Sequence, residues 1–166
     1  MTSNMEFTFS DRDFKNISQL VTNHSGIMLP EHKRMLVYSR LAKRVRALKM
    51  GSFSNYIGKL EADLARGDNT ELLQVINAMT TNVTKFFREN HHFDALATHL
   101  PELGAKFGTV KIWSCASSSG EEPWSIAMVA AEAMKAHKNL KINIHASDLD
   151  SNMIARTKAG VYKLPP

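Results

Sequence analysis

The chain has 166 residues, of which 43% are hydrophobic and 22% are charged, and this composition is sufficient for a folded core. The sequence contains no run of about 18 apolar residues, so we expect no membrane-spanning helix. The net charge of +5 indicates attraction to an acidic partner, whether nucleic acid, an anionic membrane surface or an acidic protein. The single cysteine, Cys115, excludes an internal disulfide and a cysteine metal cluster, and the amino terminus lacks a signal-peptide pattern, so we expect a cytoplasmic protein without a metal site.

The first hundred residues predict helices joined by short turns. Ser10 and Asp13 resemble a helix-start capping pair, apolar residues follow at helical spacing, and Gly26 ends the helix. The strongest helical pattern begins at Pro30 and stops before Gly51, because proline suits the first turn of a helix and glycine suits the position after its end. The predicted helices cover residues 11–25, 30–50, 54–65, 68–82 and 88–103.

From residue 104 onward the pattern alternates between strands, at 109–115 and 140–150, and helices, at 123–138 and 151–162. This order predicts the opening of a parallel α/β sheet. The fold class is therefore an all-α helical domain over residues 1–103 followed by the first βαβ part of a Rossmann-like domain over residues 104–166. Two strands are too few for a stable doubly wound sheet, so we expect a truncated piece of a longer protein, or a sheet completed by another copy.

The helix predicted over residues 30–50 carries many basic side chains. They are Lys33, Arg34, Arg40, Lys43, Arg44 and Arg46. They form either an ordinary solvated face or a surface that attracts an acidic partner. A basic helical module that binds nucleic acid is an alternative, although the helix lacks aromatic stacking residues and a recognisable DNA-reading motif.

The carboxyl ends of the two predicted strands carry the candidate site, because parallel strands direct these ends to one crevice. The first is followed by Ser-Cys-Ala-Ser-Ser-Ser-Gly-Glu-Glu and the second by Asp-Leu-Asp, which places Glu121, Glu122 and Asp148 together. A phosphate loop or a dinucleotide fingerprint would need glycines that are absent, and three acids would repel a phosphate. A cationic nucleoside, S-adenosylmethionine, fits better. The alternative for Glu122 is that it only caps a helix that begins at Pro123, and we favour Glu122 over Glu121 for that cap.

The segments TTNVTKFFRENHHFDAL, WSCASSSGEEPWSIAM and ASDLD closely resemble the chemotaxis receptor methyltransferases, the CheR family. The resemblance covers nearly the whole chain: the N-terminal helical domain and the first half of an S-adenosylmethionine-dependent methyltransferase domain. It implies methylation of glutamate side chains on chemoreceptors, with S-adenosylhomocysteine as the product. The family continues with further strands and a small β-subdomain after the point matched by Pro166, so we expect the 166-residue chain alone to be inactive or weakly active.

The resemblance also implies the cofactor contacts. They fall on Asn82, Thr84, Arg88, Gly120, Glu121, Glu122 and Asp148. Two positions depart from the family pattern: Ser119 replaces a threonine and Trp124 a tyrosine, and both replacements keep the chemical character.

Arg88 is the candidate catalytic residue, because a guanidinium can hold the substrate carboxylate or the carboxylate of the cofactor. The helical, glutamate-bearing cytoplasmic segments of the receptors are the expected partners, guided by Arg40, Lys43 and Arg44. The alternative to an enzyme is a non-catalytic module that senses S-adenosylmethionine or S-adenosylhomocysteine.

Overall fold

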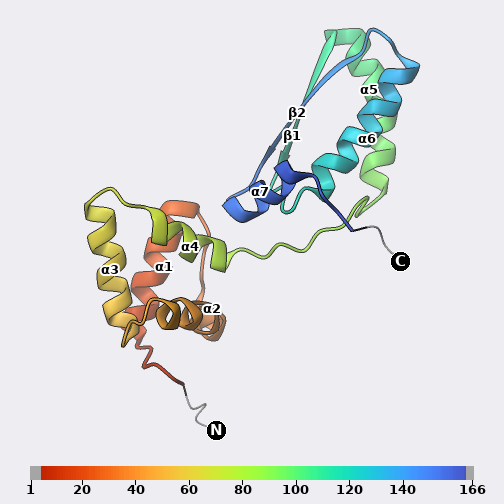
Figure 1. Ribbon diagram of the computed structural model, residues 1–166. Helices are drawn as coiled ribbons and strands as arrows, with labels where there is room; N and C mark the ends of the chain where they lie inside the picture. The colour runs from red at the N-terminus through yellow and green to blue at the C-terminus, as the bar shows by residue number, and fades with distance from the viewer. Residues whose placement is uncertain (1–4, 164–166) are drawn as a thin grey trace. The chain divides into compact units, whose positions relative to one another are not determined.

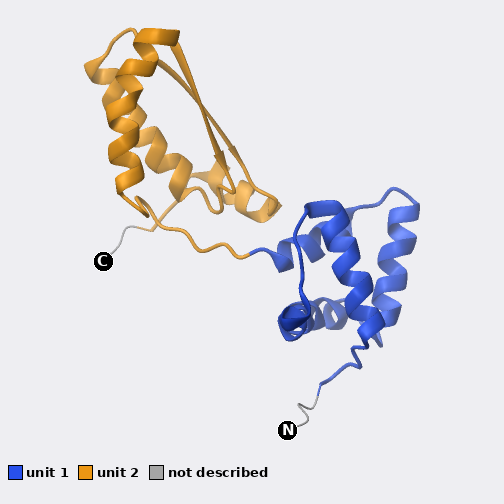
Figure 2. Ribbon diagram, turned by 180° about the vertical axis from the view of Figure 1, so that it is seen from behind, with its two compact units in different colours: residues 1–80 blue, residues 81–166 orange. Residues whose placement is uncertain are grey.

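The computed structural model describes residues 5–163 and divides into two compact units, residues 1–80 and residues 81–166 (Figures 1 and 2). The first unit is all-helical and the second is a small α/β unit, as predicted. The division falls at Thr80, earlier than the predicted boundary after residue 103. The helix over residues 91–107 belongs to the second unit, because it packs against the sheet.

The first unit contains four α-helices and a short 3₁₀ turn in its described part. They are α1 (Asp11–Ser25), η1 (Glu31–Lys33), α2 (Arg34–Ala47), α3 (Phe53–Ala65) and α4 (Thr70–Met79). The predicted capping pair is confirmed: the Ser10 hydroxyl accepts from the Asp13 amide, and the Asp13 carboxylate accepts from the Ser10 amide. Gly26 ends α1 in a left-handed conformation that costs little only for glycine.

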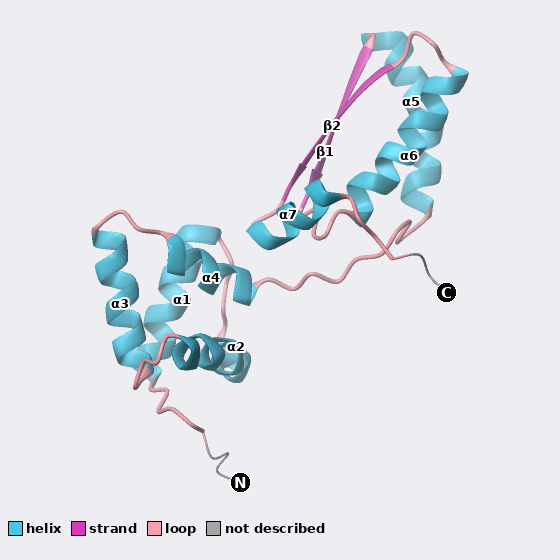
Figure 3. Ribbon diagram, in the orientation of Figure 1, coloured by secondary structure: helices cyan, strands magenta, loops and turns pink. Residues whose placement is uncertain are grey.

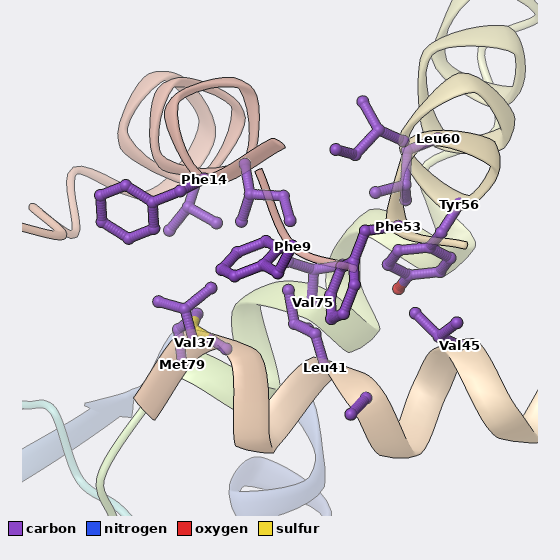
Figure 4. Close-up of a cluster of buried hydrophobic side chains, with 14 of the residues drawn as sticks. Phe9, Phe14, Val37, Leu41, Val45, Phe53, Tyr56, Leu60, Val75 and Met79 are labelled. Atoms are coloured by element: carbon purple, nitrogen blue, oxygen red, sulfur yellow. The ribbon is translucent and has the colours of Figure 1, made fainter. Parts of the chain in front are cut away.

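The core of the first unit is aromatic at its centre (Figure 4). The Phe9 and Phe53 rings lie 4.5 Å apart between their centroids. Val37, Leu41 and Val45 recur every four residues along α2, so they form one buried stripe that faces this cluster. The basic side chains of α2 therefore lie on the remaining faces of the helix.

The second unit consists of two strands and three helices in its described part. They are α5 (His91–Phe107), β1 (Thr109–Cys115), α6 (Glu121–Ala136), β2 (Lys141–Ser147) and α7 (Ser151–Ala159). The strands are parallel and in register from Thr109 opposite Lys141 to Cys115 opposite Ser147. Helices α5 and α6 lie side by side over one face of this sheet (Figure 3), and α6 is the helix that connects the two parallel strands.

Helix α5 runs past the predicted boundary at Gly104. A β-carbon at Gly104 would overlap the Leu140 side chain, which lies against the helix at this point. Glycine at this position therefore allows close packing inside a helix and does not mark a linker.

The opposite face of the sheet is open. Its side chains alternate with the buried ones along each strand, and Trp113 is 68% exposed. A hollow of about 370 Å³ lies on the sheet, lined by Lys111, Ile112, Trp113, Asn143, Ile144 and His145. It lies before the strand ends, so it is not the predicted crevice.

No helix within residues 5–163 has the length and apolar character needed to cross a membrane.

Candidate functional site

The carboxyl ends of β1 and β2 meet, as the sequence predicts. Cys115 and Ser147 are paired at the ends of the strands, and the Ser117 amide donates to the Ser147 carbonyl at 2.9 Å. The turn over residues 116–120 and the acid Asp148 therefore lie on one edge of the sheet.

The turn over residues 116–120 has an unusual backbone. Ala116, Ser118 and Gly120 have positive φ values of 63°, 50° and 104°. For residues with a side chain this conformation costs free energy, and such residues gather at functional sites. Phe87 and Glu89, in the other predicted cofactor segment, have positive φ as well. Four of the five non-glycine residues with positive φ within residues 5–163 thus lie in these two segments.

Gly120 is required by its neighbours in this chain. A β-carbon there would overlap the Tyr162 hydroxyl and lie 2.9 Å from Thr157 Oγ1. The same two residues bond the turn: Tyr162 donates to the Ser119 carbonyl at 2.8 Å, and Thr157 donates to the Ser118 carbonyl at 3.1 Å. Burial and the nearby Glu121 carboxylate raise the pKa of Tyr162, which keeps its hydroxyl a donor.

Asp148 braces the turn. One carboxylate oxygen accepts from the Ser118 amide at 2.7 Å and the other accepts from the Asp150 amide at 2.8 Å. A carboxylate offers about four lone-pair sites, so Asp148 can still accept hydrogen bonds from the hydroxyl groups of a ligand.

The two adjacent glutamates are the first residues of α6. The helix begins at Glu121, two residues before the predicted start, and its N-cap is Gly120, which has no side chain to cap it. The expectation that Glu122 caps a helix begun at Pro123 is therefore wrong. Glu122 accepts instead from the Ser114 hydroxyl of β1 at 2.7 Å, and Glu121 accepts from the Ser119 hydroxyl at 2.6 Å.

The segment after Thr81 lies against the same elements. Asn82 donates to the Asp150 carboxylate at 2.7 Å, and the Phe87 amide donates to the Ser125 hydroxyl of α6 at 3.0 Å. Thr84 is half-buried. Arg88 is exposed, and its guanidinium donates to the Val83 carbonyl at 3.0 Å, which folds the side chain back over its own segment.

His91 and His92, at the start of α5, stack edge to face with their ring centroids 4.1 Å apart. Both side chains are exposed. Cys115 is exposed at the end of β1.

The predicted receptor-binding residues lie on α2 in the first unit. Arg40 donates to the carbonyls of Ala78 and Thr80, both at 2.9 Å. Arg44 forms a two-pronged ion pair with the buried Glu71, which raises the pKa of Arg44 above its ordinary value. Lys43 is exposed.

Sequence reasoning missed several residues of this edge. Tyr162, Thr157 and Asp150 all come from α7 or its flanks, and neither Tyr162 nor Thr157 carries a signal in the local pattern. Only Asp150 could have been found, as the second acid of Asp-Leu-Asp before a predicted helix start.

A parallel βαβ unit with acidic groups at the ends of its strands is the geometry of a nucleoside-binding α/β domain. Residues 82–164 match the family model described as "CheR methyltransferase, SAM binding domain", and residues 12–80 match "CheR methyltransferase, all-alpha domain". The chain therefore belongs to the CheR methyltransferase family, and the two matched ranges correspond to the two units of the structure.

Curated relatives carry the same description. The chain is 41% identical over 155 residues to "Chemotaxis protein methyltransferase" of Salmonella typhimurium, covering 93% of this chain and 51% of the relative. It is 40% identical over 154 residues to the protein of that name in Escherichia coli, with the same two shares. It is 39% identical over 161 residues to "Chemotaxis protein methyltransferase 2" of Pseudomonas aeruginosa, covering 97% and 55%. The chain thus spans about half the length of the curated relatives it matches.

The residues at this edge fit the cofactor that the family model names. The Ser117 and Ser118 side chains are 1% and 8% exposed, and their hydroxyls have no hydrogen-bond partner in the described part of the chain. Buried polar groups are normally paired, so these two hydroxyls are candidate partners for a bound ligand or water. Glu121, Glu122 and Asp148 form no ion pair within residues 5–163. An uncompensated acidic edge favours a ligand with hydroxyl groups and positive charge.

Proposed function

We propose that the complete protein transfers a methyl group from S-adenosylmethionine to glutamate side chains of chemoreceptors, forming glutamyl methyl esters in the cytoplasm. The observation that carries this proposal is the acidic edge of the sheet, where, among the residues that the structure describes, three carboxylates without ion pairs lie beside two buried hydroxyls without hydrogen-bond partners. The proposal is supported by the family match and by the relatives named for chemotaxis.

The cofactor would lie across the strand ends. Asp148 keeps acceptor sites that ribose hydroxyls could use, and its position three residues before the first residue of α7 would set the depth of the nucleoside. Glu121 and Glu122 would offset the positive charges of the ligand. Gly120 contributes through the shape of the turn, because its own α-carbon faces Tyr162. Asn82, Thr84 and Arg88 would close the site from the segment after Thr81.

Methyl transfer to a carboxylate needs little acid–base catalysis. When bound, the cofactor would supply a methyl group on a positively charged sulfur; transfer of that methyl group to a carboxylate oxygen would form the ester and release the sulfur as a neutral thioether. A glutamate is already ionised at neutral pH, so a general base is not needed. What the protein must provide is alignment of the carboxylate and exclusion of water. Arg88 is the proposed group for alignment, because a guanidinium binds a carboxylate in two-point fashion.

The proposed partner surface is α2. Receptor segments that carry glutamates are acidic, and a basic helix would guide them to the enzyme by long-range attraction. Arg40 and Arg44 also hold the first unit together, so Lys43 is the member of the proposed set that is exposed. The same intramolecular bonds reduce the number of α2 cations available to nucleic acid.

Two measurements on the complete gene product test this proposal. Titration calorimetry with S-adenosylhomocysteine is expected to show one saturable site, and a chemoreceptor cytoplasmic fragment is expected to acquire base-labile methyl groups from labelled S-adenosylmethionine. Absence of binding would refute the cofactor assignment. Binding without transfer to any receptor fragment would favour the sensing module over the enzyme.

A further inference from the structure

Asp150 is a buried carboxylate with no assigned role in the proposed reaction. Its side chain is 4% exposed, and it lies at the start of α7, two residues after Asp148. Burying a carboxylate is costly unless hydrogen bonds satisfy it. The hydrogen bonds that the Asp150 carboxylate accepts therefore indicate the role of this residue.

The two carboxylate oxygens of Asp150 serve different segments. Oδ1 accepts from the Asn152 amide at 3.0 Å, which is an ordinary cap for α7. Oδ2 accepts from Asn82 Nδ2 at 2.7 Å, although Asn82 lies 68 positions earlier in the chain. Capping alone explains the first bond and leaves the second unexplained.

The bond to Asn82 fixes the side-chain orientation of a predicted cofactor contact. An ionised carboxylate only accepts hydrogen bonds, so it must face the amino group of the amide. The carbonyl oxygen of Asn82 is then held on the other arm of the amide. A serine or an asparagine at position 150 would cap α7 as well as aspartate does, but would not impose this orientation.

Asp150 also connects Asn82 to the turn after β1. Its backbone amide donates to Asp148 Oδ1 at 2.8 Å, and Asp148 Oδ2 accepts from the Ser118 amide at 2.7 Å. An uninterrupted chain of bonds thus runs from Asn82 through Asp150 and Asp148 to Ser118. All four residues belong to the second unit, and three of them lie in segments proposed to surround the cofactor.

We propose that Asp150 is a positioning residue of the cofactor site, which orients the Asn82 amide and holds Asp148 and the turn over residues 116–120 in register with it. It does not touch the cofactor itself. This inference rests on the proposed function, because it assigns a role within the same site.

The test is a double-mutant cycle for S-adenosylhomocysteine affinity, measured by calorimetry on the complete gene product. Asp150→Asn is expected to weaken binding about tenfold or more, because the hydrogen bond to a charged group is lost and Asn82 must either face a second amino group or reverse its own amide. Asn82→Asp alone is expected to weaken binding too, since two carboxylates then face each other. The combined exchange, Asn82→Asp with Asp150→Asn, restores one donor and one acceptor and is expected to bind more tightly than either single variant.

Asp150→Ser is the matched control for capping. Serine keeps the cap of α7 but cannot reach Asn82. The thermal midpoint of Asp150→Ser is therefore expected to stay near that of Asp150→Asn, while its affinity for S-adenosylhomocysteine falls below that of the unmodified protein. If Asp150→Asn fails to fold, Asp150→Ser takes its place in the comparison.

The outcomes separate the two proposals. If the unmodified protein binds no S-adenosylhomocysteine, the proposed function is wrong and this inference falls with it. If it binds but the Asp150 variants bind equally well, or the effects at positions 82 and 150 simply add, Asp150 is only a helix cap and the proposed function stands.

Discussion

Arg88 is the single side chain on which the proposed transfer depends most directly. Replacing it with alanine removes the only group proposed to align the reacting carboxylate, so the rate of methyl transfer is expected to fall about a hundredfold or more. Because Arg88 is exposed and bonds only the Val83 carbonyl among the described residues, the fold should stay intact by circular dichroism. Arg88→Lys, which keeps the charge but not the two-point geometry, should recover only part of the rate. Near-normal turnover by Arg88→Ala would remove it from the mechanism.

Gly120 gives a prediction about stability. Gly120→Ala places a methyl group against Tyr162 and Thr157 in a backbone with φ of 104°, so the free energy of unfolding of the second unit should fall by about 1–3 kcal/mol. Gly58→Ala is the matched control: Gly58 lies inside α3 with open space around it, and alanine should raise stability by about 0.5–1 kcal/mol. Urea denaturation measures both. Adding Tyr162→Phe to Gly120→Ala should recover part of the loss, and no loss at Gly120 would contradict the packing described.

At this scale the sequence predicted the acids but not their bonds. Glu121, Glu122 and Asp148 could be placed together because parallel strands bring their carboxyl ends to one edge. The partners of these acids could not be predicted, since Ser114 and Ser119 are serines in a run of serines with nothing to distinguish them. The role of Tyr162 could not be predicted from the sequence for another reason: its hydrogen bond to Ser119 depends on how the chain after α7 returns over the turn.

Helix α2 combines a structural and a proposed recognition role, and substitutions can separate them. Arg44→Ala leaves the buried Glu71 carboxylate without its ion pair and is expected to cost about 3–5 kcal/mol of unfolding free energy. Lys43→Glu should leave stability nearly unchanged, because the side chain is exposed. In a methylation assay, Lys43→Glu should lower the rate at low salt and flatten its salt dependence. An unchanged salt profile would count against α2 as the receptor surface.

The cap of α1 gives a pH prediction. Burial alone would raise the pKa of Asp13, but hydrogen bonds from the Ser10 side chain and amide and from Ser54, together with Arg12, hold the pKa below its ordinary value. A lowered folded-state pKa means that the carboxylate stabilises the fold above the unfolded-state pKa and loses that contribution as pH falls through the folded-state pKa. Unfolding free energy measured from neutral pH to below about pH 4 should therefore decline less steeply in Asp13→Asn than in the unmodified chain. Parallel curves would contradict this account.

Element boundaries were predicted with uneven success, and the differences have physical causes. Strand 109–115 was predicted with the bounds that the structure shows, because small residues follow it at once. Helix α6 starts earlier than predicted, since glutamates are favourable in the first turn of a helix and Pro123 is tolerated there. Helix α5 runs through Pro101 and Gly104, which local preferences would break, because packing against Leu140 and the sheet outweighs them.

At the scale of the whole chain, the open face of the sheet carries the prediction of self-association. The sheet has only two strands in its described part, and Trp113 is exposed on the face that α5 and α6 leave uncovered. The 166-residue chain on its own is therefore expected to form dimers or larger species with rising concentration, as uncovered sheet faces and edges pair. Light scattering across a dilution series measures this, with Trp113→Lys as a variant that should shift the chain toward monomer. A monomer at every concentration would refute the prediction.

The positions of Trp113 and Trp124 allow the two units to be followed separately by their intrinsic fluorescence. Both tryptophans of the sequence lie in the second unit, whereas Tyr38 and Tyr56 lie in the core of the first. Indole emission therefore follows the second unit alone while tyrosine signals report largely on the first. Trp124 adds spatial detail, because its ring nitrogen donates to the Thr157 carbonyl at 3.2 Å and its ring lies beside Gly160. Because Trp113 emits as well, Trp113→Phe isolates the emission of Trp124, which then reports whether α7 keeps its contact with this ring during a ligand titration.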